Sequence, residues 1–301
     1  MTSELFFSEL EREFPELELR RNEPMSNHTT FRIGGPAAAV ALPKGDELAR
    51  VVRFALSKGV RPLVIGSGSN ILAPDGVLDR FVVRTRMGEP NITVEGESVY
   101  APAGALLSQI AAAACGAGLA GFEFAAGIPG TLGGALLMNA GAYGGEMKDV
   151  AVSTDWLDSD GHGRTLTGAE HAFAYRTSFF AGAEAYILGG RIKLMRDDRE
   201  AIRGRMDALA EKRRASQPLE MPSAGSAFKR PAGGYAAAMI DEAGLRGLRV
   251  GGACVSEKHA GFIVNTGGAT CRDVLELIDK VRRAVYDRFG TELEPEIRIV
   301  S

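Results

Sequence analysis

The sequence predicts an α+β protein of two or three domains, and three observations support this class. The chain has 301 residues, which at roughly 150 residues per domain corresponds to about two domains. Helix-like and strand-like segments are mixed along the chain. Glycine is unusually frequent, at 38 positions. Since glycine serves where backbone turns sharply or approaches a ligand closely, this composition favours a small-molecule site.

Composition and charge exclude several classes of protein. Hydrophobic residues make up 45% of the chain and charged residues 24%, which excludes disorder and collagen. The net charge of −3 gives no basis for a nucleic acid or an anionic membrane as partner. Aromatic residues are only 7%, which argues against stacking platforms for single-stranded nucleic acid. We therefore expect small-molecule substrates. The sequence does not predict an oligomeric state, and a monomer is the default.

Cysteine and histidine patterns predict neither disulfides nor a metal site. The three cysteines, Cys115, Cys254 and Cys271, form no C-x-x-C pair, and the four histidines show no metal-binding spacing. The acidic N-terminus is not a signal peptide, so the cytoplasm is the expected location. Residues 101–122 and 124–145 carry no charge. They are rich in Gly and Ala, so we expect a buried helix and ligand-packed backbone rather than membrane spans.

Hydrophobic periodicity and capping signals predict the elements in order. Helices are predicted at 3–14, between Asp46 and Gly59, and at 105–117, 198–214, 234–243 and from Thr270 to Gly290. Strands are predicted within 24–35 and at 60–65, 80–85, 91–95, 98–101, 151–158, 163–167, 185–195, 248–255, 260–265 and 292–300.

Two glycine-rich segments are candidate cofactor sites. Gly66, Ser67, Gly68, Ser69 and Asn70 follow an apolar strand, where consecutive backbone N–H groups and two hydroxyls can cradle phosphate. This loop is neither a Rossmann fingerprint nor a P-loop, and a simple tight turn is the alternative. The second segment lets backbone lie against a flat, uncharged ring, or else is a packed turn region. Its candidate residues are Gly127, Ile128, Pro129, Gly130, Thr131, Gly133, Gly134, Asn139 and Gly141. Together the two segments suggest a dinucleotide such as FAD.

Three further motifs contain candidate catalytic groups. Tyr175 and Arg176 place a cation among aromatic residues, where it can bind a carboxylate or stabilise developing negative charge. Ser226 lies in a glycine loop near the basic Lys229, and Glu296 is a carboxylate beside an otherwise apolar predicted strand. Taken singly, the alternatives are a salt-bridged arginine, a turn serine and an edge-strand charge.

In this order, the motifs resemble those of the UDP-N-acetylenolpyruvoylglucosamine reductases (MurB; UDP-N-acetylmuramate dehydrogenases), flavoenzymes of bacterial peptidoglycan synthesis. The resemblance covers about residues 24–301. Its motifs are NHTTFRIGGP at 27–36, GSGSN at 66–70, AGIPGTLGGALLMNAGAYGGE at 126–146, YRTSFF at 175–180, GSAFKRP at 225–231 and PEIR at 295–298.

The resemblance implies an FAD-binding fold of the vanillyl-alcohol-oxidase (PCMH) type followed by an α+β substrate-binding domain. It divides the chain into a lead-in at 1–26, an FAD-binding domain at 27–196 that splits near 85, and a substrate domain at 205–301. The loop at 66–70 would lie on the pyrophosphate and 126–146 along the flavin. Because that loop contains neither His nor Cys, the FAD is expected to be non-covalent.

The resemblance also implies the reaction and the residues that perform it. NADPH would reduce the flavin, whose N5 would pass hydride to C3 of the enolpyruvyl group of UDP-N-acetylglucosamine enolpyruvate. Arg176 would stabilise the resulting enolate, Glu296 would orient the acid network, and Ser226 would protonate C2. Tyr175 and Lys229 are the remaining candidates for substrate contacts. The product would be UDP-N-acetylmuramate, and the role would lie in cell-wall formation, with its consequences for cell shape and division.

The chain departs from one branch of the family. Only 50 residues separate Arg176 from Ser226, as in the shorter second type, so a tyrosine-bearing lid is expected to be missing. Arg230 stands where the family commonly has asparagine, and Lys258 and His259 are either nucleotide contacts or surface-turn residues. The rival hypotheses are another FAD-dependent oxidoreductase of the same fold, which would usually carry a His or Cys attachment site, and a nucleotide-binding protein without catalysis.

Overall fold

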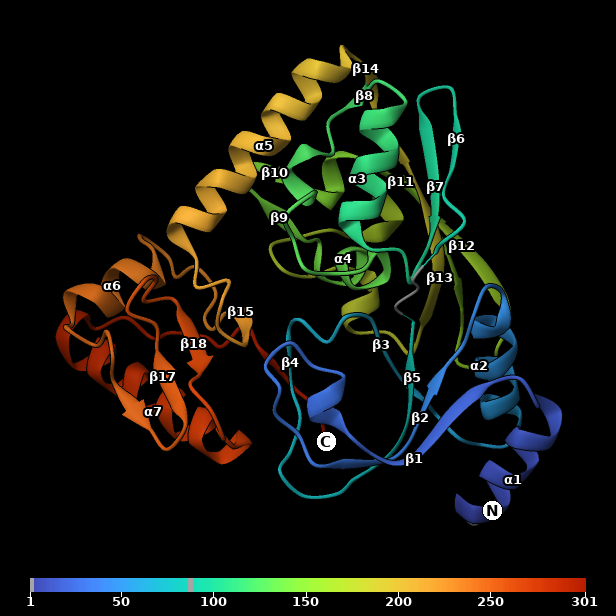
Figure 1. Ribbon diagram of the computed structural model, residues 1–301, viewed down its shortest axis with the longest axis horizontal. Coiled ribbons are helices and arrows are strands. Elements are labelled where there is room, and N and C mark those ends of the chain that lie inside the picture. The colour runs from blue at the N-terminus through green and yellow to red at the C-terminus, as the bar shows by residue number, and fades with distance from the viewer. Residues whose placement is uncertain (1–2, 86–88) are drawn as a thin grey trace. The chain divides into compact units, whose positions relative to one another are not determined.

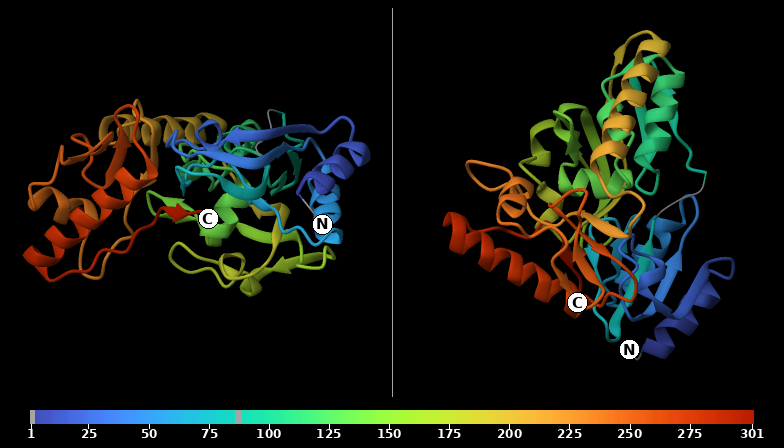
Figure 2. Two further views of the ribbon diagram at one scale, coloured as in Figure 1. Left: turned by 90° about the horizontal axis from the view of Figure 1, so that it is seen from below. Right: turned by 60° about the vertical axis from the view of Figure 1, so that its left-hand side comes forward.

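The computed structural model describes residues 3–85 and 89–301, and the chain divides into two compact units. Each unit is assembled from segments that are far apart in the sequence (Figures 1 and 2). Unit 1 comprises Met1–Arg21, Ala39–Ser67 and Arg80–Glu211, and unit 2 comprises Asn22–Ala38, Gly68–Asp79 and Lys212–Ser301. The predicted divisions at 1–26, 27–196 and 205–301 are continuous instead. Five of their residues, 1, 2 and 86–88, lie outside the described part of the chain, the last three just after the predicted split near 85.

The first sheet has the strand order β1-β2-β5-β3, with β3 and β5 parallel. Its strands are β1 (Glu18–Pro24), β2 (Pro36–Leu42), β3 (Leu63–Ile65) and β5 (Leu78–Arg84), and the helices nearest to them in sequence are α1 (Ser3–Glu13) and α2 (Glu47–Ser57). Helix α1 is amphipathic, and the rings of Phe6 and Phe7 lie 5.2 and 5.9 Å from the ring of Phe81 on β5. Aromatic pairs at this spacing stabilise beyond simple area burial.

The second sheet lies wholly in unit 1 and is antiparallel, with the order β12-β11-β13-β7-β6. Its strands are β6 (Thr93–Glu95), β7 (Ser98–Pro102), β11 (Ala151–Leu157), β12 (Gly163–Thr167) and β13 (Tyr186–Lys193). Helices α3 (Leu107–Gly116) and α4 (Leu132–Met138) pack on this sheet (Figure 1). A Cβ at Gly190 would lie 3.0 Å from Leu136, so this glycine allows α4 to approach β13 closely.

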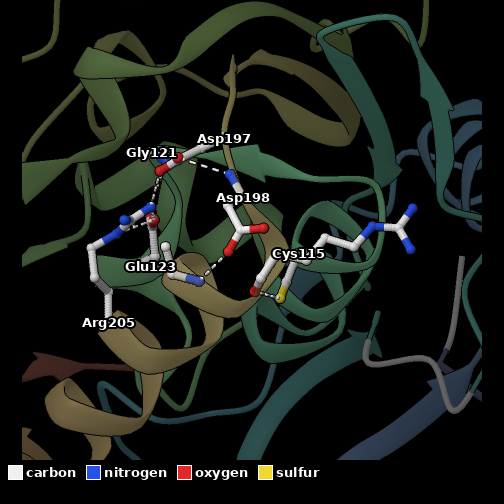
Figure 3. Close-up of polar contacts among 8 residues, drawn as sticks. Cys115, Gly121, Glu123, Asp197, Asp198 and Arg205 are labelled. Atoms are coloured by element: carbon white, nitrogen blue, oxygen red, sulfur yellow. Dashed lines mark hydrogen bonds and ion pairs between the residues drawn. The ribbon is translucent and has the colours of Figure 1, made fainter.

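Most of helix α5 (Arg199–Ser216) belongs to unit 1. A cluster of charged residues in its first half bonds it to the rest of that unit (Figure 3). The Arg205 guanidinium donates to Glu123 at 2.8 and 2.9 Å and to Asp197 at 2.6 Å. Asp198 accepts from the N–H of Ala201, which satisfies one donor of the first helical turn. Two short strands, β8 (Leu119–Ala120) and β14 (Met195–Arg196), pair just before the helix.

Unit 2 is built on a four-stranded antiparallel sheet with the order β15-β18-β17-β16. Its elements are β4 (Ile71–Leu72), β15 (Ser223–Ser226), α6 (Ala236–Glu242), β16 (Arg249–Val250), β17 (Ala253–Val255), β18 (Phe262–Asn265), α7 (Cys271–Phe289) and β19 (Arg298–Ile299). Helix α7 packs against β16 and β17 (Figures 1 and 2). It buries an apolar stripe at helical spacing, formed by Val274, Leu277, Ile278, Val281 and Val285.

The N-terminus of α7 shows how the sequence fixes an element boundary. Thr270 accepts from the N–H of Asp273, and the Asp273 carboxylate accepts from the N–H of Thr270, which is a capping box. Asp75 accepts from the N–H groups of Cys271 and Arg272 at 2.6 and 3.0 Å. The first three helical N–H groups are therefore all bonded. Burial raises the pKa of the Cys271 thiol to about 11, so this cysteine stays protonated.

Most predicted elements are confirmed, and the differences have physical causes. The capping box and the left-handed Gly290 begin and end α7 as predicted. The predicted strand within 24–35 is wrong, because a 3-10 turn at Met25–Asn27 and positive φ at Arg32 and Gly34 interrupt an extended backbone there. The strands on either side, β1 and β2, were missed, as were β15 and α4. The predicted strand at 292–300 is wrong in length, because only 298–299 form a regular strand. All three cysteines are free and buried. Within residues 3–85 and 89–301, no helix has both the length and the apolar character that crossing a membrane requires.

The charged cluster at α5 predicts a pH dependence of stability. Burial raises the pKa of Glu123, but hydrogen bonds from its own N–H, from Arg205 and from Gly121 outweigh this and lower it. The ionised carboxylate therefore stabilises the fold above its unfolded pKa of about 4.3, and this contribution is lost as the pH falls through the folded pKa. We expect Glu123→Gln to be less stable than wild type at pH 7 in urea unfolding. The difference should shrink between about pH 5 and pH 3.

The control for this prediction is Glu97→Gln, which changes an exposed carboxylate of the same unit. It should leave the pH profile of the wild type unchanged. A Glu123→Gln variant that loses stability in parallel with the wild type over this range would contradict the prediction.

Candidate active site

The predicted site residues divide between the two units. Unit 1 holds Gly66, Ser67, the segment 127–141, Tyr175 and Arg176. Unit 2 holds Gly68, Ser69, Asn70, Ser226, Lys229 and Glu296. The chain passes from one unit to the other inside the 66–70 loop, between Ser67 and Gly68.

In unit 1, the loop after β3 lies against the residue that precedes α4. A Cβ at Gly66 would lie 2.2 Å from the Thr131 hydroxyl, so no other residue type fits there without movement. The hydroxyls of Ser67 and Thr131 are both buried, and neither has a hydrogen-bond partner within the described chain. Because buried hydroxyls are normally bonded, this pair indicates a polar ligand. Two hydroxyl donors beside a glycine loop fit the pyrophosphate of FAD.

The glycine-rich segment after residue 125 is held by backbone bonds. Leu107 donates its N–H to Gly130, while Leu132 and Gly133 donate theirs to Ala105 and Ala103. A Cβ at Gly133 would lie 3.1 Å from that of Ala103, so glycine permits this close approach. Gly127, Pro129 and Gly134 are exposed, while Ile128 and Gly130 are half-buried. A fixed and accessible strip of backbone is suited to a flat ring.

Asn139 ends α4 and is buried, with a left-handed φ of 43°. Its amide group donates to Glu146 and to the carbonyl of Ala174 at 2.9 and 3.1 Å, and its oxygen accepts from the N–H of Lys148 at 2.9 Å. The predicted contact of Asn139 with cofactor stays a prediction. Within the protein, its side chain joins two neighbouring loops.

Arg176 occupies a backbone conformation that most residues avoid. Its φ is 56°, in a turn closed by hydrogen bonds between Ala174 and Thr177. A residue other than Gly or Asn in the left-handed region costs about 1–2 kcal/mol, and such strain is often stored at functional sites. The guanidinium contacts the carbonyl of Gly141 at 3.4 Å and lies 5.3 Å from the ring centre of Tyr175.

In unit 2, the C-terminal segment joins three of the predicted motifs. Glu296 donates its N–H to Ala227, the residue after Ser226, at 2.9 Å. The carbonyl of Glu296 accepts from the Asn70 amide at 3.1 Å, and Arg298 donates its N–H to the Asn70 carbonyl. Ser226 and Glu296 are both half-buried. These bonds hold Glu296 beside Asn70 and beside Ala227, the residue after Ser226, although the three segments are widely separated in the sequence.

Lys229 and the turn at 256–261 flank this group. Lys229 forms an ion pair with Glu294 at 2.5 Å, so its role toward substrate stays a prediction. Gly261 accepts from the N–H of Ala227, and His259 contacts the N–H of Gly261 and the edge of the Phe262 ring. Burial lowers the pKa of His259, which favours a neutral imidazole in this turn.

Glu146 lies near the Arg176 turn and is not among the residues predicted for the site. It bonds Asn139 and forms an ion pair with Lys148 at 3.0 Å. The signal available was its position, because it is the first charged residue after the uncharged run 124–145.

One exposed turn gathers potential metal ligands, which the sequence did not predict. Asp158, Asp160 and His162 offer ligand atoms within 4.8 Å of one another. Asp158 already accepts from the N–H groups of Asp160 and His162 and from the Arg164 guanidinium. These bonds account for the turn without an ion.

Comparison with known proteins connects this geometry to a family. The model described as "FAD binding domain" matches residues 36–167, and the model of the C-terminal domain of UDP-N-acetylenolpyruvoylglucosamine reductase matches residues 217–300. The reductase of Caldanaerobacter subterraneus subspecies tengcongensis is 46% identical over 99% of both chains. That of Syntrophomonas wolfei is 42% identical over 98% of this chain and 99% of its own.

A solved structure supports the same assignment. The crystal structure of UDP-N-acetylenolpyruvylglucosamine reductase (MurB) from Thermus caldophilus is 33% identical and has a TM-score of 0.79. The match covers 95% of this chain and 99% of that one. The predicted fold class, an FAD-binding domain of the PCMH type with a C-terminal α+β domain, is thereby confirmed. The chain belongs to the UDP-N-acetylenolpyruvoylglucosamine reductase (MurB) family and is an oxidoreductase of the UDP-N-acetylmuramate dehydrogenase type.

Proposed function

We propose that this enzyme uses non-covalent FAD and NADPH to reduce UDP-N-acetylglucosamine enolpyruvate to UDP-N-acetylmuramate. The observation that supports the proposal is the backbone hydrogen bond from Glu296 to Ala227, which joins the segment of the carboxylate residue to the segment that contains Ser226. A serine and a carboxylate fit the proton transfer that an enolpyruvyl reduction needs. The nucleotide substrates favour a cytoplasmic location for a step in peptidoglycan precursor synthesis.

The residues that would hold the cofactor are the two with buried, unbonded hydroxyls and the accessible backbone that follows residue 126. The hydroxyls of Ser67 and Thr131 would donate to the pyrophosphate, and the backbone of 127–130 would lie along the flavin. When bound, the flavin supplies the hydride for the substrate. The protein contributes the position of each reacting group and a fixed electrostatic environment.

Three side chains would then act on the enolpyruvyl group. Arg176 would bind the substrate carboxylate and stabilise the negative charge that develops on it, because a preorganised cation needs no rearrangement during the reaction. Ser226 would deliver a proton to C2. A hydroxyl is a weak acid, but an enolate carbon is strongly basic, so good placement is sufficient. Glu296 would orient this acid.

The substrate is tested by anaerobic stopped-flow spectroscopy of the flavin-loaded enzyme. NADPH should bleach the flavin, and UDP-N-acetylglucosamine enolpyruvate should then restore the oxidised spectrum rapidly. If only oxygen restores it, the chain acts on another substrate, as the alternative of a different FAD-dependent oxidoreductase requires. A protein that cannot be loaded with FAD would contradict the proposal altogether.

Ser226→Ala should separate the two half-reactions. Loss of a general acid typically slows the chemical step about 10²- to 10⁴-fold, so we expect the substrate to reoxidise the flavin that much more slowly. Flavin content and reduction by NADPH should be unchanged. The matched control is Ser223→Ala on the same strand, which should retain activity. Normal turnover by Ser226→Ala would remove Ser226 from the mechanism.

Thr131→Val tests the cofactor contact, because it replaces the hydroxyl by a methyl group of the same shape. A net hydrogen bond contributes about 0.5–1.5 kcal/mol, so FAD affinity should fall about 2- to 12-fold. The cofactor-free protein should be equally stable or more stable, since it no longer buries an unbonded hydroxyl. Flavin fluorescence titration and thermal melts measure the two effects. Unchanged affinity would show that this hydroxyl does not contact FAD.

A further inference from the structure

The turn that contains Arg176 is bonded to a second loop of unit 1 by a few partly buried hydrogen bonds. That loop is the hairpin formed by β9 (Gly141–Ala142) and β10 (Gly145–Glu146). The hairpin begins just after α4, and the Arg176 turn lies between β12 and β13. The side chain of Asn139 lies between them.

The Arg176 turn is held at its first residue. The Ala174 carbonyl accepts from the N–H of Thr177 and also from the Asn139 amide group at 3.1 Å. A turn whose third residue has positive φ normally selects glycine or asparagine there. Because Arg176 is neither, this conformation needs support from outside the turn, and the Asn139 bond provides it.

The Arg176 side chain contacts the same hairpin as Asn139. Its guanidinium lies 3.4 Å from the carbonyl of Gly141. Gly141 pairs with Glu146 across this hairpin, and a Cβ at Gly141 would lie 2.6 Å from the Glu146 Cγ, so the two residues are in close contact. A change at Asn139 or Glu146 would therefore reach both the backbone and the guanidinium of Arg176.

Glu146 fixes which way the Asn139 amide faces. One carboxylate oxygen accepts from the Asn139 amide at 2.9 Å and from the Lys148 ammonium at 3.0 Å. The Asn139 oxygen faces the N–H of Lys148. The hydrogen bond from Lys148, with help from Asn139 and the nearby charge of Arg176, lowers the pKa of Glu146. At neutral pH Glu146 is therefore ionised and accepts the hydrogen bond from the Asn139 amide group.

From this geometry we propose that Asn139 and Glu146 are positioning residues that hold the Arg176 guanidinium in place for the carboxylate of the substrate. The inference rests on the proposed function, since it deepens the role given there to Arg176. Neither residue would touch the reacting atoms. Both would act through the Ala174 carbonyl and the 141–146 hairpin.

Asn139→Gly tests this role and separates it from a structural one. Glycine is the residue best suited to a left-handed helix end, so the backbone should be satisfied and the protein should fold. If Asn139 served only to end α4, the variant would be fully active. We expect the oxidation of reduced flavin by substrate to slow about 10- to 100-fold, as for a catalytic group displaced by about 1 Å. Because the polar atoms of the Asn139 side chain are bonded within the protein, flavin content and reduction by NADPH should match wild type, whereas loss of flavin would instead support the predicted contact of Asn139 with the cofactor.

Two further variants sharpen the test. Asn139→Asp keeps the shape of the side chain but removes its donors, so it should slow the same half-reaction. Asn22→Gly is the matched control, because Asn22 also has a left-handed φ, of 50°, but is exposed and lies in β1. It should leave both half-reactions unchanged.

A double-mutant cycle with Arg176→Lys decides whether Asn139 acts through Arg176. If it does, Asn139→Gly should have little further effect in the Arg176→Lys background, because coupled residues are not additive. Independent, multiplicative effects would overturn the inference, as would loss of flavin from Asn139→Gly or full activity of that variant. Failure of the wild-type enzyme to reduce the substrate would instead refute the proposed function, so the two failures are distinguishable.

Discussion

Unit 2 depends on the backbone hydrogen bonds of residues 294–300. On one side, Glu294 and Glu296 bond Lys229 and Ala227, and on the other, Arg298 and Val300 bond Asn70 and Leu72. Each such bond contributes only about 1 kcal/mol net, but together they fix register. Since side chains alternate along an extended segment, a slip of one residue would turn Glu296 away from its present side. The proposed pairing of Ser226 with Glu296 therefore rests on main-chain geometry.

In unit 1, the corresponding constraint is that glycine residues allow backbone segments to lie very close to neighbouring residues. Gly66 meets Thr131, Gly133 meets Ala103, and Gly145 meets the ring of Phe124, each at a distance that leaves little or no room for a side chain. Non-glycine residues with positive φ also gather here, at Asn139, Tyr143 and Arg176. The glycine content noted in the sequence thus reflects a packed region as well as a ligand surface. Strain and close packing coincide where the proposed cofactor and substrate groups meet the chain.

Local rules predicted local features well. The capping box at Thr270 and the glycine after α7 were predicted from neighbouring residues alone, and α1, α5 and β12 were predicted from local patterns in the same way. Helix α4 was missed because two glycines lie in its seven residues and weaken its helical signal. Asp75 was missed because it caps a helix almost 200 residues away. The charge of Arg176 among aromatic residues made it a candidate, whereas the contacts of Glu146 with Asn139 and Lys148 depend on the folded hairpin, and only its position after the uncharged run pointed to it.

The separation of the paired segments in unit 2 also governs when this unit can form. Asn70 and Glu296 are 226 residues apart, and at ribosomal rates the later segment follows the earlier one by about 10 to 45 s. Closing so long a loop lowers stability only slightly, because its entropy grows with the logarithm of length, but distant pairing slows folding. During synthesis, the loop residues at 68–72 must therefore wait without their final partners. Assembly of this half of the candidate site is a late event, set by translation as much as by sequence.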